Sequence, residues 1–576
     1  MGSRRGRLLI LLGLTGSLVV SCTNSPPPPL VTTPPARTTP SRPVDYTQVV
    51  VGVDSVAGGY NPHLLANQTL VARTLGELVL PSVFHAGPDG TPQLDQGLMV
   101  SAEVTKAEPY TVTYTIRKEA AWSDGPPIAA EDFAYLWQNM RSQPGVADPA
   151  GYRLITSVSG RADGRIVDVT FSRPYPGWRS LFNDLLPSHV FKDAPGGWAR
   201  ALTEAFPVAG GPFSIRSVDP ERREIVLERN DRYWGTSTKL QQVILRGSAQ
   251  ADMVSAMRTG DDQLAVLGPT KATYDGLVGL GKAIELSVAP TPVVVDLLLR
   301  QNSPRLSDPR LRAAVAAAID RDALITIGSA GGPDSQLRAD SPVLAPSRPG
   351  FTPSIPAQGS PAKPEPDAVK RLLTAAGYAE VNGAWLRDDR PLSLVIGAPG
   401  DRTPYAAVAK AVQQQLTAVG IGSRIIDTGG DQLFDQVLTT TTTPTSTDAT
   451  RPAESDSTVD VAVVPQSVGG DPATVLASTF GCPVALADGT VPAANPAGFC
   501  DRDLQPVIDA ALTGAMPLSE ALATVEPALW RQQVVIPLFQ LADVLATRPE
   551  IVGVTVGPPL VGPFAGAAGW TRIARR

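Results

Sequence analysis

The sequence predicts an α/β protein of more than one domain, and three observations carry this prediction. At 576 residues the chain is too long for a single hydrophobic core, because domains of roughly 50–250 residues are the rule. Residues 293–300 form a short apolar, β-branched run of strand length, and a helical pattern follows it. Between residues 367 and 426, helical and strand-like segments alternate, which is typical of a domain with a mostly parallel sheet.

The helix after the strand at 293–300 has a well-marked beginning. Asp308 can accept hydrogen bonds from the first free N–H groups. Pro309 occupies the first helical position, where a missing N–H costs nothing. Leu311, Val315 and Ile319 are four residues apart, so one apolar face of this helix is expected to pack inward.

The other elements follow from the same periodicities. Residues 111–117 alternate between polar and apolar positions and predict a half-buried strand, and residues 130–140 predict an amphipathic helix. The remaining predicted strands are 48–53, 392–396, 423–426 and 459–464, and the remaining predicted helices are 367–376, 405–419, 504–512 and 518–533.

The composition excludes one class of partner. The chain has 49 basic and 55 acidic side chains and a net charge of −6. Nucleic-acid binding requires clustered positive charge, so no nucleic-acid partner is expected. The 56 prolines and 52 glycines indicate that loops are abundant.

The start of the chain predicts export. Three arginines precede an apolar run over residues 8–20, which is too short to span a membrane and is typical of a signal peptide over residues 1–21. The run ends in Val19-Val20-Ser21-Cys22, which resembles a bacterial lipobox. That resemblance implies acyl chains on Cys22 that hold the protein at the cell membrane, on its extracytoplasmic face. The alternative is a plain signal peptide with a stray cysteine.

Two segments have compositions that cannot bury a core. Residues 22–45 are rich in proline, threonine and serine and predict an extended tether. A Thr/Ser/Pro run at about 439–458 predicts a disordered insertion.

Little in the sequence indicates catalysis. The three histidines are not spaced as metal ligands, and there is no G-x-S-x-G nucleophile elbow. In an exported protein Cys482 and Cys500 are expected to form a disulfide, with free thiols as the alternative. Carboxylates that meet only in three dimensions remain open, but the sequence favours a binding protein with no cofactor and no metal.

Four motifs resemble those of family 5 of the bacterial extracellular solute-binding proteins, the oligopeptide- and dipeptide-binding type. The resemblance covers about residues 48–575. The motif residues are Trp122-Ser123-Asp124-Gly125-Pro126-Pro127 followed by Phe133, Arg229-Asn230-Asp231-Arg232-Tyr233-Trp234, Asp308 to Arg321, and Lys370 to Tyr378.

This resemblance implies a two-lobed fold like that of periplasmic binding proteins, of the large three-subdomain type, with a ligand cleft between the lobes. The first lobe is expected at 46–296 with a C-terminal return at 533–576, and the second lobe at 297–532.

One departure from the peptide-binding pattern narrows the range of candidate ligands. Peptide-binding members carry a W-x-A-D-like segment where this chain has residues 465–472. Here the tryptophan is absent, and Asp471 lies beside the D-P pair instead. The closer likeness is to a mycobacterial lipoprotein branch of the family. That likeness implies binding of a monoacyl phosphatidylinositol tetramannoside and its commitment to lipomannan and lipoarabinomannan synthesis.

Two other functions remain open. One is an oligopeptide-binding component of an ABC importer, whose partner is a permease. The other is a regulator that contacts a mannosyltransferase without importing anything.

Ligand-binding residues can be proposed only from their positions in the resemblance, and a purely structural role is the alternative for each. Arg300→Ala is expected to weaken ligand binding without unfolding the lobe. Two aromatic residues could stack on sugar rings or belong to the core. The candidates are Tyr60, Asn61 and His63 in the first loop, the aromatic pair Tyr175 and Trp178, Arg300 and Gln301 at the hinge strand, and Asp471 in the second lobe.

Overall fold

The computed structural model describes residues 45–574, except residues 88, 204–205, 358–360, 362, 439–457, 487, 490 and 558–559. The predicted signal peptide, Cys22, nearly all of the tether and nearly all of the 439–458 insertion therefore lie outside the described residues. Residues 46–576 form one compact unit. None of the described helices is long and apolar enough to cross a membrane.

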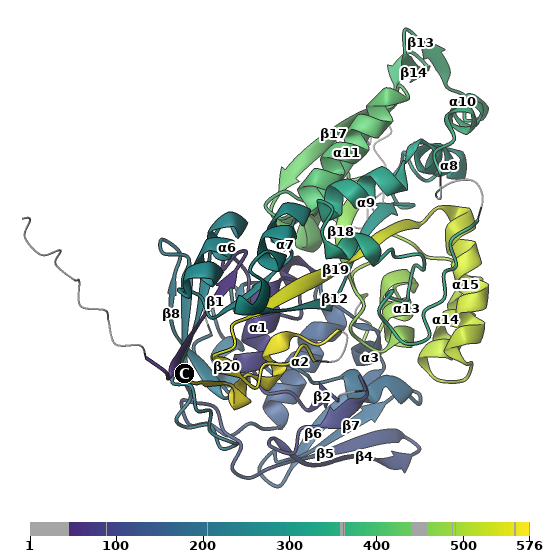
Figure 1. Cartoon of the computed structure of the whole chain (residues 1–576). Coiled ribbons are helices and arrows are strands. Elements are labelled where there is room, and N and C mark those ends of the chain that lie inside the picture. The colour runs from purple at the N-terminus through teal and green to yellow at the C-terminus, as the bar shows by residue number, and fades with distance from the viewer. Residues whose placement is uncertain are drawn as a thin grey trace, which may run out of the picture. The chain divides into compact units, whose positions relative to one another are not determined.

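A ten-stranded sheet runs through this unit, and two long strands lie side by side in its middle (Figure 1). The strand order is β17-β16-β18-β12-β19-β11-β1-β10-β9-β8. In chain order the strands are β1 (Gln48–Val53), β8 (Phe213–Asp219), β9 (Glu224–Arg229), β10 (Gln242–Gly247), β11 (Leu264–Leu267), β12 (Glu285–Leu299), β16 (Ser393–Pro399), β17 (Gly422–Thr428), β18 (Val461–Ser467) and β19 (Val535–Thr547).

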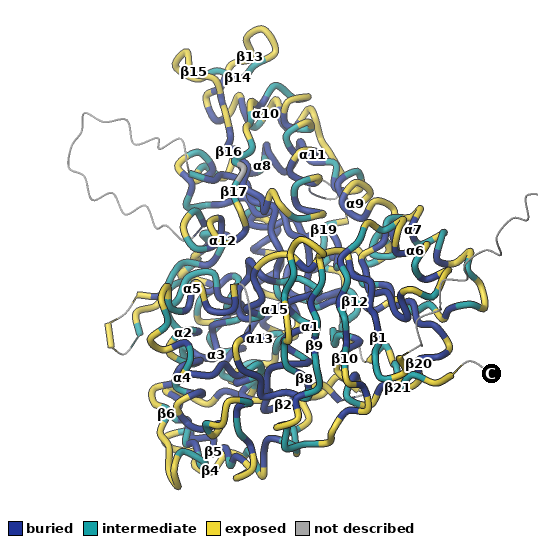
Figure 2. Tube along the Cα trace, turned by 90° about the vertical axis from the view of Figure 1, so that its left-hand side faces the viewer, coloured by how far each residue is buried: buried dark blue, intermediate teal, exposed yellow. Residues whose placement is uncertain are grey.

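Strand β12 is longer than its apolar run predicts. It spans 15 residues and pairs antiparallel with both β18 and β19. Its final seven residues are all buried, because packed side chains cover both faces of the sheet there. A strand buried on both faces reads as a continuous apolar run, and residues 293–299 show this pattern except at Asp296. Figure 2 shows the buried trace in the middle of the molecule.

The second half of the sheet is only partly parallel. Strands β17, β16 and β18 are parallel to one another, whereas β12 enters antiparallel and joins them to the rest of the sheet. The expectation of a mostly parallel sheet therefore holds for three strands. The departure arises because β12 and β19 are shared with the other half of the molecule.

The expected helix after β12 is α8 (Pro309–Ala318), and its Asp308 cap accepts a hydrogen bond from Arg310 N at 2.8 Å. A second helix, α9 (Arg321–Ser329), starts after Asp320, which accepts from Ala323 N at 3.0 Å. Buried side chains of both helices pack against the face of β12 that carries Leu297. Helices α10 (Pro366–Ala375) and α11 (Tyr405–Ala418) complete this layer.

A separate four-stranded antiparallel sheet has the order β4-β5-β7-β6. Its strands are β4 (Met99–Ala107), β5 (Tyr110–Ile116), β6 (Ile155–Arg161) and β7 (Ile166–Phe171), and α2 (Ala130–Ser142) packs on it. The motif before α2 is structural, because Asp132 Oδ2 accepts from Trp122 Nε1 at 3.1 Å and from Ala129 N at 3.0 Å.

Three late helices follow β18: α13 (Pro472–Phe480), α14 (Gln505–Leu512) and α15 (Leu518–Gln532). The segment between α13 and α14 is closed by a disulfide between Cys482 and Cys500. The other elements are α1 (Leu70–Val79), β2 (Phe84–Ala86), β3 (Pro92–Leu94), α3 (Ala150–Arg153), α4 (Ser188–Phe191), α5 (Gly197–Arg200), α6 (Gln250–Thr259), α7 (Lys271–Val278), β13 (Ala379–Val381), β14 (Ala384–Arg387), β15 (Arg390–Pro391), α12 (Gly430–Gln432), β20 (Ile551–Val552), β21 (Thr571–Arg572) and short 3-10 and π turns.

Candidate ligand-binding site

A cleft forms where the region of α2 and α3 meets the end of β18 and helix α13. Several hydrogen bonds between described residues cross it. Ser467 Oγ donates to Asp148 Oδ2 at 2.7 Å, and Ala150 N donates to Ser478 Oγ at 3.1 Å. The hydroxyls of Tyr175 and Thr474 share a third bond at 2.7 Å. The two sides are therefore closed on one another in this structure.

The cleft contains two cavities, and Asp148 and Ser467 line both of them. The apolar compartment has a volume of about 60 Å³ and is lined by Leu65, Gln143, Gly145, Val146, Asp148, Pro149, Arg153, Asp296, Leu298, Phe434, Val464, Pro465, Gln466, Ser467, Ser478, Thr479 and residues 493–497. The polar compartment has a volume of about 510 Å³, and its polar lining includes His63, Gln68, His85, Asp148, Arg179, Ser180, Asn183, Asp184, Arg348, Ser467, Asp471 and Thr474.

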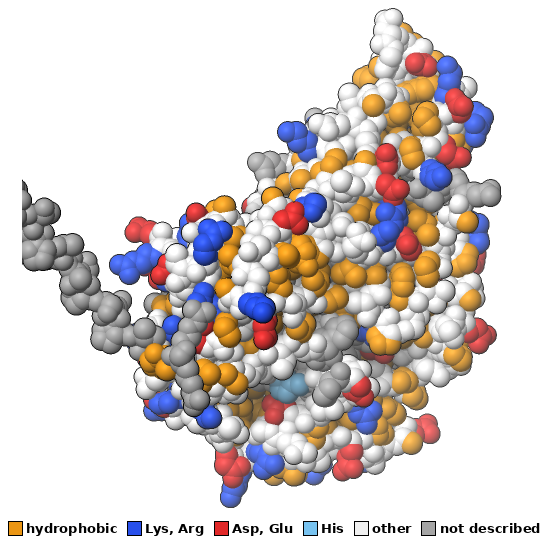
Figure 3. Space-filling model, viewed as in Figure 1, with side chains coloured by type: hydrophobic (Ala, Val, Ile, Leu, Met, Phe, Trp, Pro, Cys, Tyr) orange, Lys and Arg blue, Asp and Glu red, His pale blue; other side chains and the backbone are white. Residues whose placement is uncertain are grey.

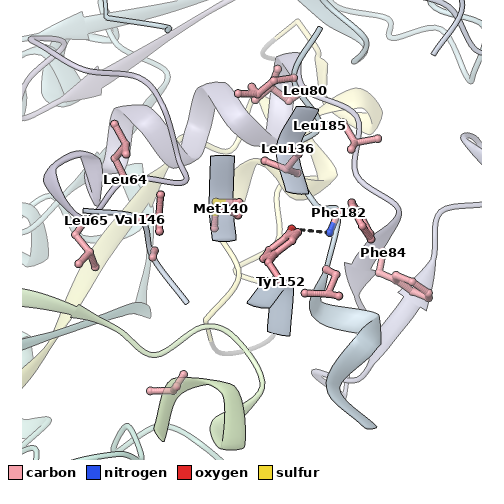
Figure 4. Close-up of a cluster of buried hydrophobic side chains, with 14 of the residues drawn as sticks. Leu64, Leu65, Leu80, Phe84, Leu136, Met140, Val146, Tyr152, Phe182 and Leu185 are labelled. Carbon is pink, nitrogen blue, oxygen red and sulfur yellow. Dashed lines mark hydrogen bonds between the residues drawn. The ribbon is translucent and has the colours of Figure 1, made fainter. Parts of the chain in front are cut away.

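The wall beneath both compartments is held in place by packed side chains. Figure 4 shows Leu65 and Val146, which line the apolar compartment, in the same buried cluster as Met140 and Tyr152, which line the polar one. The backbone N–H of Phe182 donates to the Tyr152 hydroxyl at 2.8 Å. This bond and the surrounding core fix the position of the α3 side of the cleft.

Strand β12 contributes a buried carboxyl group to the apolar compartment. Asp296 lines this cavity and is only 1% exposed. Neither of its carboxyl oxygens has a hydrogen-bond partner among the described residues. Burial raises the pKa of Asp296 well above its usual value, although the positive charge of Arg321 acts in the opposite direction. Burial therefore favours the neutral carboxyl group over the carboxylate.

Helix α3 contributes a cation to the same compartment. The Arg153 guanidinium donates only a long hydrogen bond, from Nη2 to the carbonyl of Ala493 at 3.5 Å, and its buried Nε has no partner. Arg153 forms no ion pair within the described part of the chain. Burial lowers the pKa of Arg153 to about 10, so the group keeps its charge at neutral pH.

The polar compartment carries charges of both signs. Asp148 has a positive φ of 51°, and burial raises its pKa to about 6. Arg348 Nη2 donates to the carbonyl of Gly470 at 2.6 Å. The exposed Arg179 stacks on the Trp178 ring at 4.3 Å. On the face shown in Figure 3, basic and acidic side chains are intermixed and form no large basic patch.

Two of the predicted site residues line the polar compartment. His63 Nε2 is hydrogen-bonded to the carbonyl of Asp184 at 2.9 Å, and burial lowers the pKa of His63. Asp471 also caps α13, because its Oδ2 accepts from both the N and Oγ1 of Thr474 at 3.0 Å.

The other predicted residues line neither compartment. Tyr60 is buried and donates to the carbonyl of Val56 at 2.8 Å, and Asn61 is fully buried. Tyr175 and Trp178 are 0% and 3% exposed, so their rings belong to the core and present no face to a sugar. Gln301 donates to Gln532 Oε1 at 3.2 Å.

Arg300 braces the fold behind the apolar compartment. Its guanidinium donates to the carbonyls of Pro496, Val459 and Leu438 at 3.1, 3.2 and 2.6 Å, and the side chain is 2% exposed. Arg300 was expected to bind ligand in the cleft. In the structure its guanidinium donates these hydrogen bonds to the protein backbone instead.

Three cleft residues were missed by sequence reasoning: Asp148, Arg153 and Asp296. Asp148 lies just before α3 and Arg153 is its last residue, so both are distant in the sequence from the strands of the cleft. Asp296 had a detectable pattern, since a carboxylate inside a strand buried on both faces is rare unless it is paired or functional.

The fold and the cleft together define an extracellular solute-binding protein. Residues 96–481 match the profile of bacterial extracellular solute-binding proteins, family 5, and the chain belongs to this family. It is 35% identical to the probable monoacyl phosphatidylinositol tetramannoside-binding protein LpqW of Mycobacterium tuberculosis, with 98% of each chain covered. It is 27% identical to the oligopeptide-binding protein OppA of Mycobacterium tuberculosis, over 65% of this chain and 63% of that one.

Solved structures confirm the predicted two-lobed α/β fold. The periplasmic EDTA-binding protein EppA has a TM-score of 0.69 at 23% identity and covers 92% of this chain and 97% of its own. The oligopeptide-binding protein AppA from Bacillus subtilis, in complex with a nonapeptide, has a TM-score of 0.71 at 15% identity and covers 92% and 99%.

We predict that Arg300→Ala destabilises the protein. The substitution leaves three buried carbonyls without donors, and each unsatisfied group costs about 1–3 kcal/mol. The free energy of unfolding in urea should fall by at least about 3 kcal/mol, whereas the matched variant Gln301→Ala, which loses one bond, should lose about 1 kcal/mol or less. Equal stability of the two variants would contradict the bracing role.

Asp148 should make stability depend on pH. Its folded-state pKa of about 6 lies above the ordinary 3.8, so the folded state binds its proton more tightly than the unfolded state. Stability from this group is therefore present below about pH 4 and is lost as pH rises through 6, by up to about 3 kcal/mol. Asp148→Asn should remove this loss, which thermal unfolding of both proteins at pH 4 and pH 7 measures. Parallel pH profiles of the two proteins would rule the effect out.

Proposed function

We propose that this protein is a lipid-anchored binding protein that holds a glycolipid of the monoacyl phosphatidylinositol tetramannoside type and directs it to lipomannan and lipoarabinomannan synthesis. The observation that carries the proposal is the similarity to LpqW along 98% of both chains. The OppA relatives match over a smaller share of the chain. A binding role without catalysis agrees with the relatives, which are named as binding proteins.

The cleft chemistry supports recognition of a glycolipid headgroup. The polar compartment offers amide, hydroxyl and charged groups, which are the partners that sugar hydroxyls need. The apolar compartment of about 60 Å³ has no room for an acyl chain. Each CH₂ group that leaves a membrane costs about 0.8 kcal/mol, so we place the headgroup in the cleft and leave the acyl chains in the membrane.

An oligopeptide-binding role with an ABC importer is the second candidate. Relatives named OppA and the nonapeptide complex of AppA favour it. Asp471 is a weaker ammonium partner than a free carboxyl group, because its Oδ2 already accepts two hydrogen bonds from Thr474 and its Oδ1 is the oxygen left to meet a ligand. An ABC permease is the partner in this second candidate, and a mannosyltransferase is the partner in the first.

The bound molecule distinguishes the two candidates. We expect native mass spectrometry of the full-length chain, purified in mild detergent from an actinobacterial host, to detect an acylated phosphatidylinositol mannoside. Protein that emerges empty should take up this lipid from phosphatidylcholine vesicles and should leave a mixture of short peptides unbound. Peptides in the purified protein, or uptake of peptides alone, would assign the importer function instead.

We expect the anchor to depend on Cys22. Cys22→Ala should release the protein from the membrane fraction and abolish labelling with palmitate, because the acyl chains supply the hydrophobic attachment. The double variant Cys482→Ala/Cys500→Ala is the matched control and should remain labelled and membrane-bound. Labelling that persists in Cys22→Ala would refute the lipidation site.

A further inference from the structure

The apolar compartment contains a cation without a counter-ion. Arg153 lies at the end of α3, and among the described residues its guanidinium donates only the 3.5 Å hydrogen bond to the Ala493 carbonyl. Its Nε is buried and unpartnered. A buried charge that lacks a partner is costly, and burial is the cause that lowers the pKa of this group. A negatively charged ligand group would supply the missing partner.

The same compartment contains a hydrogen-bonding group without partners. Asp296 lines the cavity from β12, together with Leu298 from the same strand. Its two carboxyl oxygens are unpartnered and the residue is 1% exposed. A protonated carboxyl group both donates and accepts, so it suits a neutral hydroxyl, which also donates and accepts.

We infer that the apolar compartment binds the phosphate ester of a polyol, with the phosphate at Arg153 and a hydroxyl of the adjoining ring at Asp296. Guanidinium groups recognise phosphate through charge-assisted hydrogen bonds. A volume of about 60 Å³ admits roughly four water-sized groups, which suits the phosphate and the one hydroxyl at Asp296. Asp148 and Ser467 line both compartments, so the rest of the ring extends into the larger one. The identification of this phosphate as part of a lipid headgroup rests on the proposed function. The binding of a polyol phosphate by Arg153 and Asp296 does not rest on it.

An ammonium ligand suits this compartment less well. A peptide amine would place a second cation in a cavity that already contains an unpaired arginine. It would also require Asp296 to ionise, which its burial disfavours. The other possible occupant of the compartment is a buried water molecule on Asp296. If water fills it, substitutions of Arg153 and Asp296 should leave the affinity for ligand unchanged.

The experiment compares Arg153→Gln, Asp296→Asn and Asp296→Leu in the full-length protein. The probes are phosphatidylinositol tetramannoside in phosphatidylcholine vesicles, soluble inositol phosphate and inorganic phosphate. Arg153→Gln should weaken binding of the tetramannoside about 10- to 100-fold. Asp296→Asn should bind within about threefold of the wild type, because an amide also donates and accepts, whereas Asp296→Leu should lose about tenfold or more.

The matched control is Arg173→Gln, which removes an arginine that is paired with Asp509 on the surface. It should bind as the wild type does. The melting temperature of ligand-free Arg153→Gln should be unchanged or higher, because the variant loses an unpaired buried charge. A structural arginine would give the reverse pattern, with lower stability and unchanged binding, and that result would overturn the inference.

The outcomes separate this inference from the proposed function. If the wild type and Arg153→Gln bind the tetramannoside equally, the inference fails and the proposed function stands. If the wild type binds inositol phosphate or inorganic phosphate through Arg153 but ignores the lipid, the inference stands and the proposed function fails. If Asp296→Asn loses binding as completely as Asp296→Leu, the carboxyl group acts as an anion, and the hydroxyl assignment is overturned.

Discussion

The antiparallel pairing of β12 with β19 is the interaction on which the rest of the structure depends. These strands of 15 and 13 residues lie in the middle of the ten-stranded sheet and connect its two halves. A bulge between Val295 and Asp296 interrupts their register, and the carbonyls of the bulged segment at Pro537 and Leu538 accept hydrogen bonds from Arg321. Bulges re-aim side chains, and Asp296 lines the cleft beside this one.

Buried polar atoms without partners also occur in the core of the described structure, for example the Tyr114 and Tyr405 hydroxyls, but the apolar compartment brings a cation and a carboxyl group of this kind into one cavity. Elsewhere in the core, Arg300 donates to backbone carbonyls, Arg321 donates to backbone carbonyls and pairs with Asp340, and Asp132 accepts from its own helix start. Arg153 and Asp296, which both line the apolar compartment, keep unpartnered atoms. Folding alone gains nothing from such groups, and a bound ligand is the natural source of their missing partners.

Local elements were predictable because they depend on neighbouring residues. Strand β1 has the predicted bounds, and the Asp308 cap is confirmed, since periodicity and capping act within a few positions. The cleft was not predictable from the sequence. Arg153 and Asp296 line the same cavity only because α3 docks against α13 and β12 pairs with β18. The aromatic pattern of Tyr175 and Trp178 was ambiguous for a related reason: stacking platforms and core residues look alike in sequence.

A crystal structure of the protein with a monoacyl phosphatidylinositol tetramannoside tests the central claim most directly. The headgroup should occupy the cleft, with its phosphate within hydrogen-bond distance of the Arg153 guanidinium and a ring hydroxyl on the Asp296 carboxyl group. A peptide backbone in the cleft, or a glycolipid bound elsewhere while both groups remain unpartnered, would contradict it.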